Sequence, residues 1–230
     1  MLGIIGAMRE EIEELKLDII DLEIKSIGSL IFYFGKLFNK NVVLSQCGIG
    51  KVNAGIVSTL MISLFDTNTI IFTGVAGAID KRLNIGDIVI GTYLIEHDFD
   101  VTSFGGKPGE IPRMDTWKFP SDKNLVELSY EIAKKTFDDI NIFKGIILSG
   151  DEFVSSPDKI KWLKDTFDGM CTEMEGAAVA HVCHVLKTPC LIIRSISDKA
   201  DGNAHVDFKE FLNMSSKKSK ILVSKIIENL

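Results

Sequence analysis

Short apolar segments alternate with amphipathic segments along most of this chain of 230 residues. The apolar segments have the length of buried strands and lie at 2–5, 30–37, 42–45, 69–73, 88–95, 146–149 and 191–195. Segments with helical spacing of apolar positions follow Gly6 and lie at 51–65, 123–136, 157–167, 175–186 and from about 207 onward. This alternation predicts an α/β fold, in which helices cover both faces of a sheet.

Turn signals and composition refine this prediction. The Asn-Lys-Asn sequence at 39–41 predicts a hairpin between two of the strands, and Gly74 is expected to end the strand at 69–73. The segment 97–120 holds most of the prolines and predicts a long loop. No linker-like stretch divides the chain. We therefore predict a single domain over 1–230, a three-layer α/β/α architecture with a central mixed, twisted sheet.

Two carboxylates stand next to apolar segments. Glu175 begins an Ala-rich helix, and Asp198 is expected just beyond the strand at 191–195. Burying an ionised group costs free energy, so a buried carboxylate is usually retained because it has a function. In sheets covered by helices, ligands bind beyond the carboxyl ends of the strands. The residues expected at that edge of the sheet are Gly6, Gly74, Asp151 and Asp198.

Composition and charge exclude several classes of protein. The net charge of −6, with no basic stripe, argues against nucleic-acid binding. No apolar run reaches the about 20 residues of a membrane-spanning helix, and no basic leader opens the chain, so we expect a cytoplasmic protein without membrane contact. The four cysteines form no Cys-x-x-Cys pair and are expected to be buried thiols.

The candidate cofactor and metal motifs are incomplete. The Gly-Ile-Gly-Lys sequence at 48–51 precedes a predicted helix, but Asn53 replaces the third glycine of a dinucleotide turn, and Val follows the Lys where a P-loop needs Ser or Thr. His181 and Cys183 cannot share a helix face, and no other cluster has metal-ligand spacing. No nucleophile-elbow signature is present. We expect no cofactor and no metal, which leaves carboxylate chemistry.

Six motifs in order along the chain resemble one family. They are Gly3-Ile-Ile-Gly-Ala-Met-Arg-Glu-Glu11, Gly48-Ile-Gly-Lys-Val52, Gly86-Asp-Ile-Val89, Ser149-Gly-Asp151, Glu173-Met-Glu175 and Arg194-Ser-Ile-Ser-Asp198. Each is weak alone, but the ordered set resembles the 5′-methylthioadenosine/S-adenosylhomocysteine nucleosidases of the purine nucleoside phosphorylase superfamily. The resemblance implies hydrolysis of the N-ribosyl bond in these nucleosides, with release of adenine, in methionine salvage.

The resemblance also implies catalytic roles that fit the chemistry. The departing purine needs a proton, and Asp198 matches the general acid near purine N7, a role that needs a raised pKa. Glu11 matches the base that activates the attacking water, and Arg194 would help to hold that water. Glu175 matches the carboxylate that binds the ribose hydroxyls and stabilises the developing positive charge. From the residues alone, Glu11 fits equally well as an acid favoured by the dipole at a helix N-terminus.

The family's substrate contacts can be carried over position by position. Phe153 would stack on adenine, the Val154 backbone would read its polar edge, and Met174 would lie against the ribose. Val75, Glu173 and Ser197 are further binding candidates. The apolar slot for the 5′-alkylthio group would be lined by Met8, Ile49 and Phe208 and, from the neighbouring subunit of a homodimer, by Val101, Phe104 and Pro112 in the loop 97–120.

Other interpretations stay open at this point. The loop could instead fold back on its own core, which would also bury its aromatic side chains. Val75 stands where many family members have Ser, and the Arg and Ser with which related phosphorylases hold phosphate are absent, so water is the favoured nucleophile. The alternatives are a sibling hydrolase acting on a futalosine-type nucleoside, a phosphorylase, or a nucleoside-binding module without turnover.

Overall fold

A computed structural model describes residues 1–199 and 204–230, without the side chains of 204–210, 212 and 213. The strands are β1 (Leu2–Gly6), β2 (Ile20–Ile27), β3 (Leu30–Leu37), β4 (Lys40–Gln46), β5 (Thr69–Ala78), β6 (Ile88–Glu96), β7 (Phe119–Pro120), β8 (Ile142–Ser149), β9 (Cys171–Glu173) and β10 (Cys190–Asp198). The helices are α1 (Arg9–Leu17), α2 (Lys51–Leu64), the short 3₁₀ helix η1 (Thr102–Phe104), α3 (Lys123–Thr136), α4 (Pro157–Phe167), α5 (Gly176–Val185) and α6 (Ala204–Asn229).

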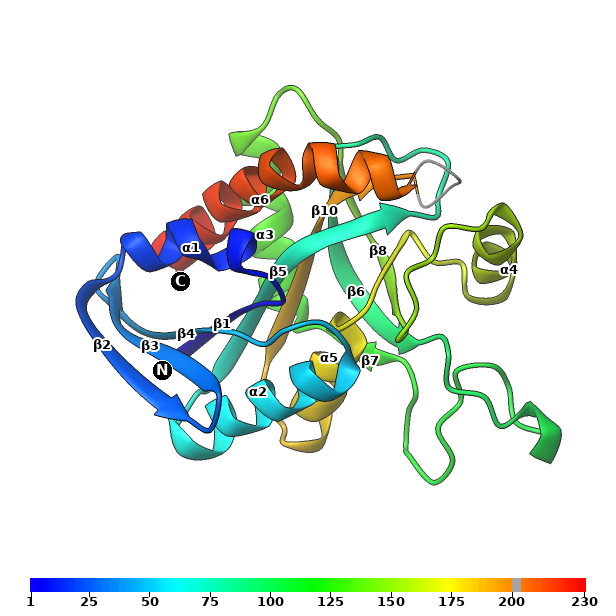
Figure 1. Cartoon of the computed structure of the whole chain (residues 1–230), viewed down its shortest axis with the longest axis horizontal. Helices are drawn as coiled ribbons and strands as arrows, with labels where there is room; N and C mark the ends of the chain where they lie inside the picture. Colours follow the sequence, from blue (N-terminus) through cyan, green and yellow to red (C-terminus); the bar gives the residue numbers. More distant parts are fainter. Residues whose placement is uncertain (200–203) are drawn as a thin grey trace.

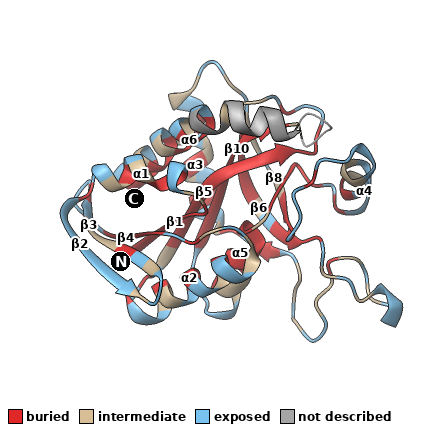
Figure 2. Ribbon diagram, viewed as in Figure 1, coloured by how far each residue is buried: buried red, intermediate tan, exposed pale blue. Residues whose placement is uncertain are grey.

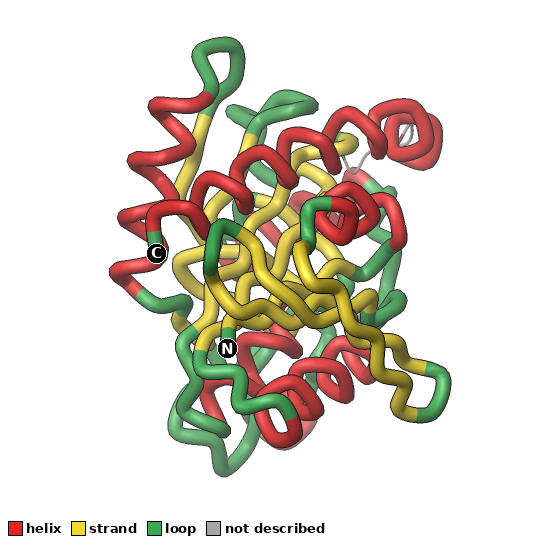
Figure 3. Tube along the Cα trace, turned by 90° about the vertical axis from the view of Figure 1, so that its left-hand side faces the viewer, coloured by secondary structure: helices red, strands yellow, loops and turns green. Residues whose placement is uncertain are grey.

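Helices cover both faces of the central sheet, as Figure 1 shows. Neighbouring residues of a strand point to opposite faces, so Ile4 packs in the core shared with α1, α3 and α6, whereas Ile5 packs in the core shared with α2 and α5. In the side view of Figure 3 the strands lie between these two groups of helices. The predicted three-layer α/β/α fold is therefore confirmed.

The sheet is mixed and partly closed. β1 pairs in parallel with β4 and β5, and β3 and β2 extend the β4 side as antiparallel strands. On the other side β5, β10, β6, β8 and β9 pair in turn, and β9 returns to β5. This closure brings the carboxyl ends of β5, β9 and β10 together at one edge of the sheet, beside the end of β1.

The burial pattern follows the layers. Figure 2 shows that the central strands are almost entirely buried, while β2 at the edge is exposed. All four cysteines are buried and free, as expected. Among the described residues, no helix combines the length and the apolar character that crossing a membrane requires.

Several element boundaries differ from the predictions. β5 continues through Gly74 to Ala78, because Gly74 pairs with Arg194 of β10 instead of ending the strand. Asp198 is the last residue of β10, after a register shift that follows Ile196, and does not lie beyond the strand. β2, β7 and β9 were not expected, whereas the predicted bounds of α3 and α4 are confirmed.

The loop 97–120 is confirmed, with only η1 and the short β7 inside it. Its tip extends away from the body of the chain, as Figure 1 shows, and the Phe104 side chain there is 91% exposed. Nearer its end, Ile111 and Met114 pack against the core and Phe119 is buried. Only this second part of the loop therefore folds back on its own core.

Candidate active site

A cavity of about 420 Å³ opens at the carboxyl ends of β1, β5 and β10. It is lined by the predicted residues Met8, Glu11, Ile49, Val75, Phe153, Val154, Glu173, Met174, Glu175, Ser197 and Asp198, and also by Ala7, Ala76, Gly77, Glu152 and Thr172. Ala76 and Gly77 belong to the segment 73–78, whose glycines predict a close approach of ligand and backbone, whereas Ala7, Glu152 and Thr172 were not predicted as site residues. The cavity therefore gathers the candidate carboxylates, from distant segments, in one place.

Glu11 is buried in the first turn of α1, and its carboxylate is held in a fixed orientation. Its Oε2 accepts hydrogen bonds from the backbone N–H of Ala7 at 2.6 Å and of Met8 at 2.9 Å, and Oε1 accepts one from Val75 at 3.2 Å. Burial raises the pKa of Glu11, against the opposing effect of these N–H groups and of Arg194. A buried, oriented carboxylate with a raised pKa has the properties of a general base.

Gly74 makes this position of Glu11 possible. A Cβ at residue 74 would lie 2.8 Å from Glu11 Oε1, closer than a side chain can approach. The glycine therefore serves the close approach of a carboxylate to β5, not the end of a strand.

Glu175 lies at the start of α5, and its carboxylate faces the N-terminus of α2. Its Oε1 accepts a hydrogen bond of 2.8 Å from the Gly50 N–H. Burial, and then the nearby charge of Glu173, raises the pKa of Glu175 to about 8. Much of the Glu175 population is therefore protonated at neutral pH, and a cationic ligand would favour its ionised form.

Glu173 and Arg194 form a buried ion pair beneath the cavity. Arg194 Nη2 lies 2.5 Å and Nε 3.1 Å from Glu173 Oε2, and Nη1 donates to the carbonyls of Phe72 and Ile193. Arg194 is 1% exposed and is absent from the cavity lining. Its Nη1 and Glu11 Oε1 both lie beside Gly74, and the role of Arg194 in holding the water near Glu11 stays a prediction.

The Glu173 carboxylate is likewise committed to protein groups. It accepts hydrogen bonds from the Ser149 hydroxyl and from the backbone N–H of Glu175 and Gly176, at the N-terminus of α5. A negative charge at a helix N-terminus is favoured by the exposed N–H groups. Glu173 therefore fixes the backbone that carries Glu175; it also lines the cavity, and its contact with the substrate stays a prediction.

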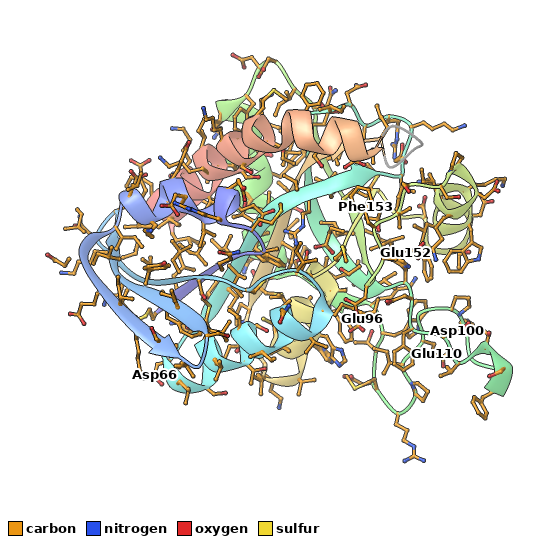
Figure 4. All side chains as sticks on the ribbon, in the orientation of Figure 1. Asp66, Glu96, Asp100, Glu110, Glu152 and Phe153 are labelled. Carbon is orange, nitrogen blue, oxygen red and sulfur yellow. The ribbon has the colours of Figure 1, made fainter. Side chains whose placement is uncertain are left out.

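Ser197 and Asp198 end β10 and line the cavity. The Ser197 hydroxyl lies 2.9 Å from Asp198 Oδ2, and both residues are buried. Phe153 lines the cavity together with Glu152, which is labelled beside it in Figure 4, and Phe153 is 46% exposed, while Val154 is buried. A buried acid and an aromatic ring in one cavity lining suit a flat heterocycle.

The predicted apolar slot is only partly described. Met8 and Ile49 line the cavity, whereas the side chain of Phe208 lies outside the described residues. Val101, Phe104 and Pro112 do not line the cavity of their own chain and belong to the projecting loop. Within the described part of the chain, no group of three or more His, Cys, Asp or Glu side chains is arranged to hold a metal ion.

Fold and site together define an α/β protein with buried carboxylates gathered in a cavity for a small ligand. A model of the phosphorylase superfamily matches residues 1–228. The chain is 43% identical, over the full length of both proteins, to the 5′-methylthioadenosine/S-adenosylhomocysteine nucleosidase of Staphylococcus haemolyticus. It therefore belongs to the phosphorylase superfamily and, within it, to the family of 5′-methylthioadenosine/S-adenosylhomocysteine nucleosidases, which confirms the resemblance found in the sequence.

Solved structures agree with this assignment. The nucleosidase of Neisseria meningitidis, in complex with methylthio-immucillin-A, superimposes with a TM-score of 0.95 at 40% identity, covering 100% of this chain and 99% of that one. The futalosine hydrolase of Helicobacter pylori also has a TM-score of 0.95, at 36% identity, with 100% and 97% covered. A sibling hydrolase thus shares the fold at comparable similarity.

Proposed function

We propose that this chain hydrolyses the N-ribosyl bond of 5′-methylthioadenosine and S-adenosylhomocysteine, releasing adenine and the 5′-thioribose. The observation that carries the proposal is the convergence of Glu11, Glu175 and Asp198 on one cavity of about 420 Å³. Relatives of this family carry the name of that activity, and one has been solved with a nucleoside-like inhibitor. No cofactor is needed for this chemistry, and the reaction would serve methionine salvage.

The three carboxylates divide the reaction between them. Asp198 protonates the purine as the bond to the sugar breaks, and the Ser197 hydroxyl beside it orients its carboxyl group. Glu11 accepts a proton from the attacking water, in the orientation that the N–H groups of Ala7, Met8 and Val75 impose. Glu175 accepts hydrogen bonds from the ribose hydroxyls and stabilises the positive charge of the sugar.

Glu173 and Arg194 hold the carboxylates of the site in position. Because their side chains are used by each other and by the backbone, we assign them a positioning role. Phe153, Val154 and Met174 would bind the adenine and ribose, Val75 would lie near the water or the ribose, and Met8 and Ile49 would bind the 5′ substituent; all six line the cavity.

Water fits the cavity better than phosphate as the nucleophile. A phosphate dianion needs cationic or N–H donors, and none of the described residues that line the cavity is Arg or Lys. Arg9, which follows Met8, is largely exposed and pairs with Glu13 at 3.2 Å. The cavity lining therefore favours hydrolysis over phosphorolysis.

A homodimer is part of the proposal. Large apolar side chains are exposed on the face formed by α2 and α5, and Phe104 is exposed at the loop tip. Contiguous exposed apolar surface marks interfaces, and a two-fold dimer would bury it. In that dimer Val101, Phe104 and Pro112 would close the 5′ slot of the partner. The single-domain organisation over 1–230 and a cytoplasmic location belong to the same proposal.

Product analysis tests the function directly. We expect adenine and free methylthioribose from 5′-methylthioadenosine in phosphate-free buffer. Methylthioribose 1-phosphate formed only with added phosphate would make the chain a phosphorylase. Turnover of a futalosine-type nucleoside but not of methylthioadenosine would favour the sibling activity, and tight binding without any turnover would favour a binding module.

A further inference from the structure

Asp98, at the start of the projecting loop, joins two other segments through its carboxylate. Asp98 Oδ1 lies 2.5 Å from Lys51 Nζ, in the first turn of α2. Asp98 Oδ2 accepts a hydrogen bond of 2.9 Å from the backbone N–H of Asp151, which follows β8. One carboxylate thus connects the loop to a helix N-terminus and to the segment after β8.

A second contact completes the connection between the three segments. Asp151 Oδ1 accepts a hydrogen bond of 2.9 Å from the backbone N–H of Lys51. Asp98, Lys51 and Asp151 therefore contact one another in every pairwise combination. Such a closed arrangement fixes relative positions more firmly than a single contact between two segments.

Both partners of Asp98 are adjacent in the chain to residues that line the cavity or contact its carboxylates. Gly50, next to Lys51, donates its N–H to Glu175 Oε1. Asp151 is followed by Glu152, Phe153 and Val154, which line the cavity mouth. Asp98 itself does not line the cavity, so it can act only through these neighbours.

The ion pair of Asp98 with Lys51 is not an ordinary surface pair. The two side chains are only 25% and 16% exposed. Lys51 Nζ also lies 3.5 Å from the carboxylate of Glu96, which in turn lies 2.9 Å from His181 Nδ1. Figure 4 shows Glu96 at the base of the projecting loop, below Glu152 and Phe153 in that view. Mobile surface pairs contribute little, but a pair held by further partners preserves its geometry.

We propose that Asp98 is a positioning residue that holds the purine-facing segment 151–154 and the N-terminus of α2 in register. In this role it sets the affinity for the purine without touching it. The inference rests on the proposed function, because that function places the adenine against Phe153. The two parts of the loop 97–120 would then have different roles. The start of the loop, with Asp98, positions residues of the cavity in its own chain, and the tip would contact the partner subunit.

The test compares variants at both ends of the contact. Asp98→Ala removes both charge-assisted contacts, with Lys51 Nζ and with the Asp151 N–H, and should raise KM for methylthioadenosine, and the Kd of adenine measured by calorimetry, by about tenfold or more. The value of kcat should change much less, because the reacting carboxylates remain. Asp98→Asn, which keeps one acceptor oxygen, should give an intermediate effect. Lys51→Met should act in the same direction, and the double variant should be no worse than the more severe single variant.

Glu127→Ala is the matched control, because Glu127 pairs with Lys144 at 2.7 Å between α3 and β8, outside the cavity lining. It should leave KM and the adenine Kd unchanged. If Asp98→Ala does not fold, as judged by its melting temperature, the Asn and Lys51→Met variants carry the test.

A KM and an adenine Kd within twofold of the wild type in these variants would overturn the role of Asp98. A loss confined to kcat would do the same. The wild type provides the separate check: if it binds adenine but does not release adenine from methylthioadenosine, the proposed function fails, while the effect of Asp98 on the adenine Kd is still measured.

Discussion

Replacing Glu175 with Gln should stabilise the fold while abolishing most of the activity. The Glu175 carboxyl is buried near Glu173, and its pKa is raised from 4.5 to about 8. Ionisation of Glu175 is therefore less favourable in the folded chain than in the unfolded chain, which lowers the free energy of unfolding at neutral pH. Gln keeps an oxygen that can accept the Gly50 N–H but carries no charge, so the cost of burial near Glu173 falls.

The magnitude follows from proton linkage. Below pH 4.5 the folded and the unfolded chain both hold the proton. Between pH 4.5 and 8 the unfolded chain releases it while the folded chain keeps it, so the folding stability falls as the pH rises. The loss is about 1.4 kcal/mol per pH unit, which gives about 3 kcal/mol at pH 7. For a chain of this size that corresponds to at most about 6–12 °C in melting temperature.

Calorimetry of both proteins from pH 5 to 8 measures this effect. The melting temperature of Glu175→Gln should exceed that of the wild type by a margin that grows with pH, and turnover of methylthioadenosine should fall sharply. Glu152→Gln is the control, because it removes a carboxylate whose side chain is 48% exposed and pairs with Lys159. A margin for Glu175→Gln that is absent, negative or independent of pH would refute the reasoning.

Three further predictions test other parts of the site. Asp198→Asn should lower kcat by about 10²–10⁴ while substrate binding, measured by calorimetry, survives, because the proton donor is lost and the hydrogen-bonding shape is kept. Arg194→Met should destabilise the fold by about 3–5 kcal/mol in denaturant titration, since it leaves Glu173 buried without its partner, and adding Glu173→Gln should recover part of that loss. Phe104→Ser should raise KM for methylthioadenosine without lowering the melting temperature, and sedimentation of the wild type should show a dimer; unchanged kinetics in a fully active monomer would contradict the shared cavity.

Much of the fold could be predicted because apolar periodicity reports burial. Strands buried on both faces, such as β1 and β6, are continuous apolar runs, and α3 has a clear amphipathic repeat and an Asp122 N-cap whose carboxylate accepts two backbone N–H groups. The exposed edge strand β2 was missed because its polar and apolar residues are both exposed to solvent. β9 was missed because three residues are too few for a periodic signal.

Closure of the sheet explains why the strand ends were misplaced. Local sequence marks Gly74 as a breaker, yet the pairing of β5 with β10, distant in the chain, carries both strands further. The same pairing brings Val75 beside Glu11 and places Asp198 at the wall of the cavity. Single-residue propensity cannot show a contact between segments more than a hundred residues apart.

The candidate site could likewise be predicted only in part from the sequence. The candidate carboxylates were identifiable, because a carboxylate next to an apolar run is costly to bury and therefore informative. The residues alone do not distinguish Glu173 from Glu175, which are separated by one residue and look alike in sequence, and only the resemblance assigned them different roles. In the structure Glu173 is saturated by Arg194, Ser149 and the α5 N-terminus, whereas Glu175 has one backbone partner and faces the cavity. The buried ion pair with Arg194, which only the fold determines, is what separates Glu173 from Glu175.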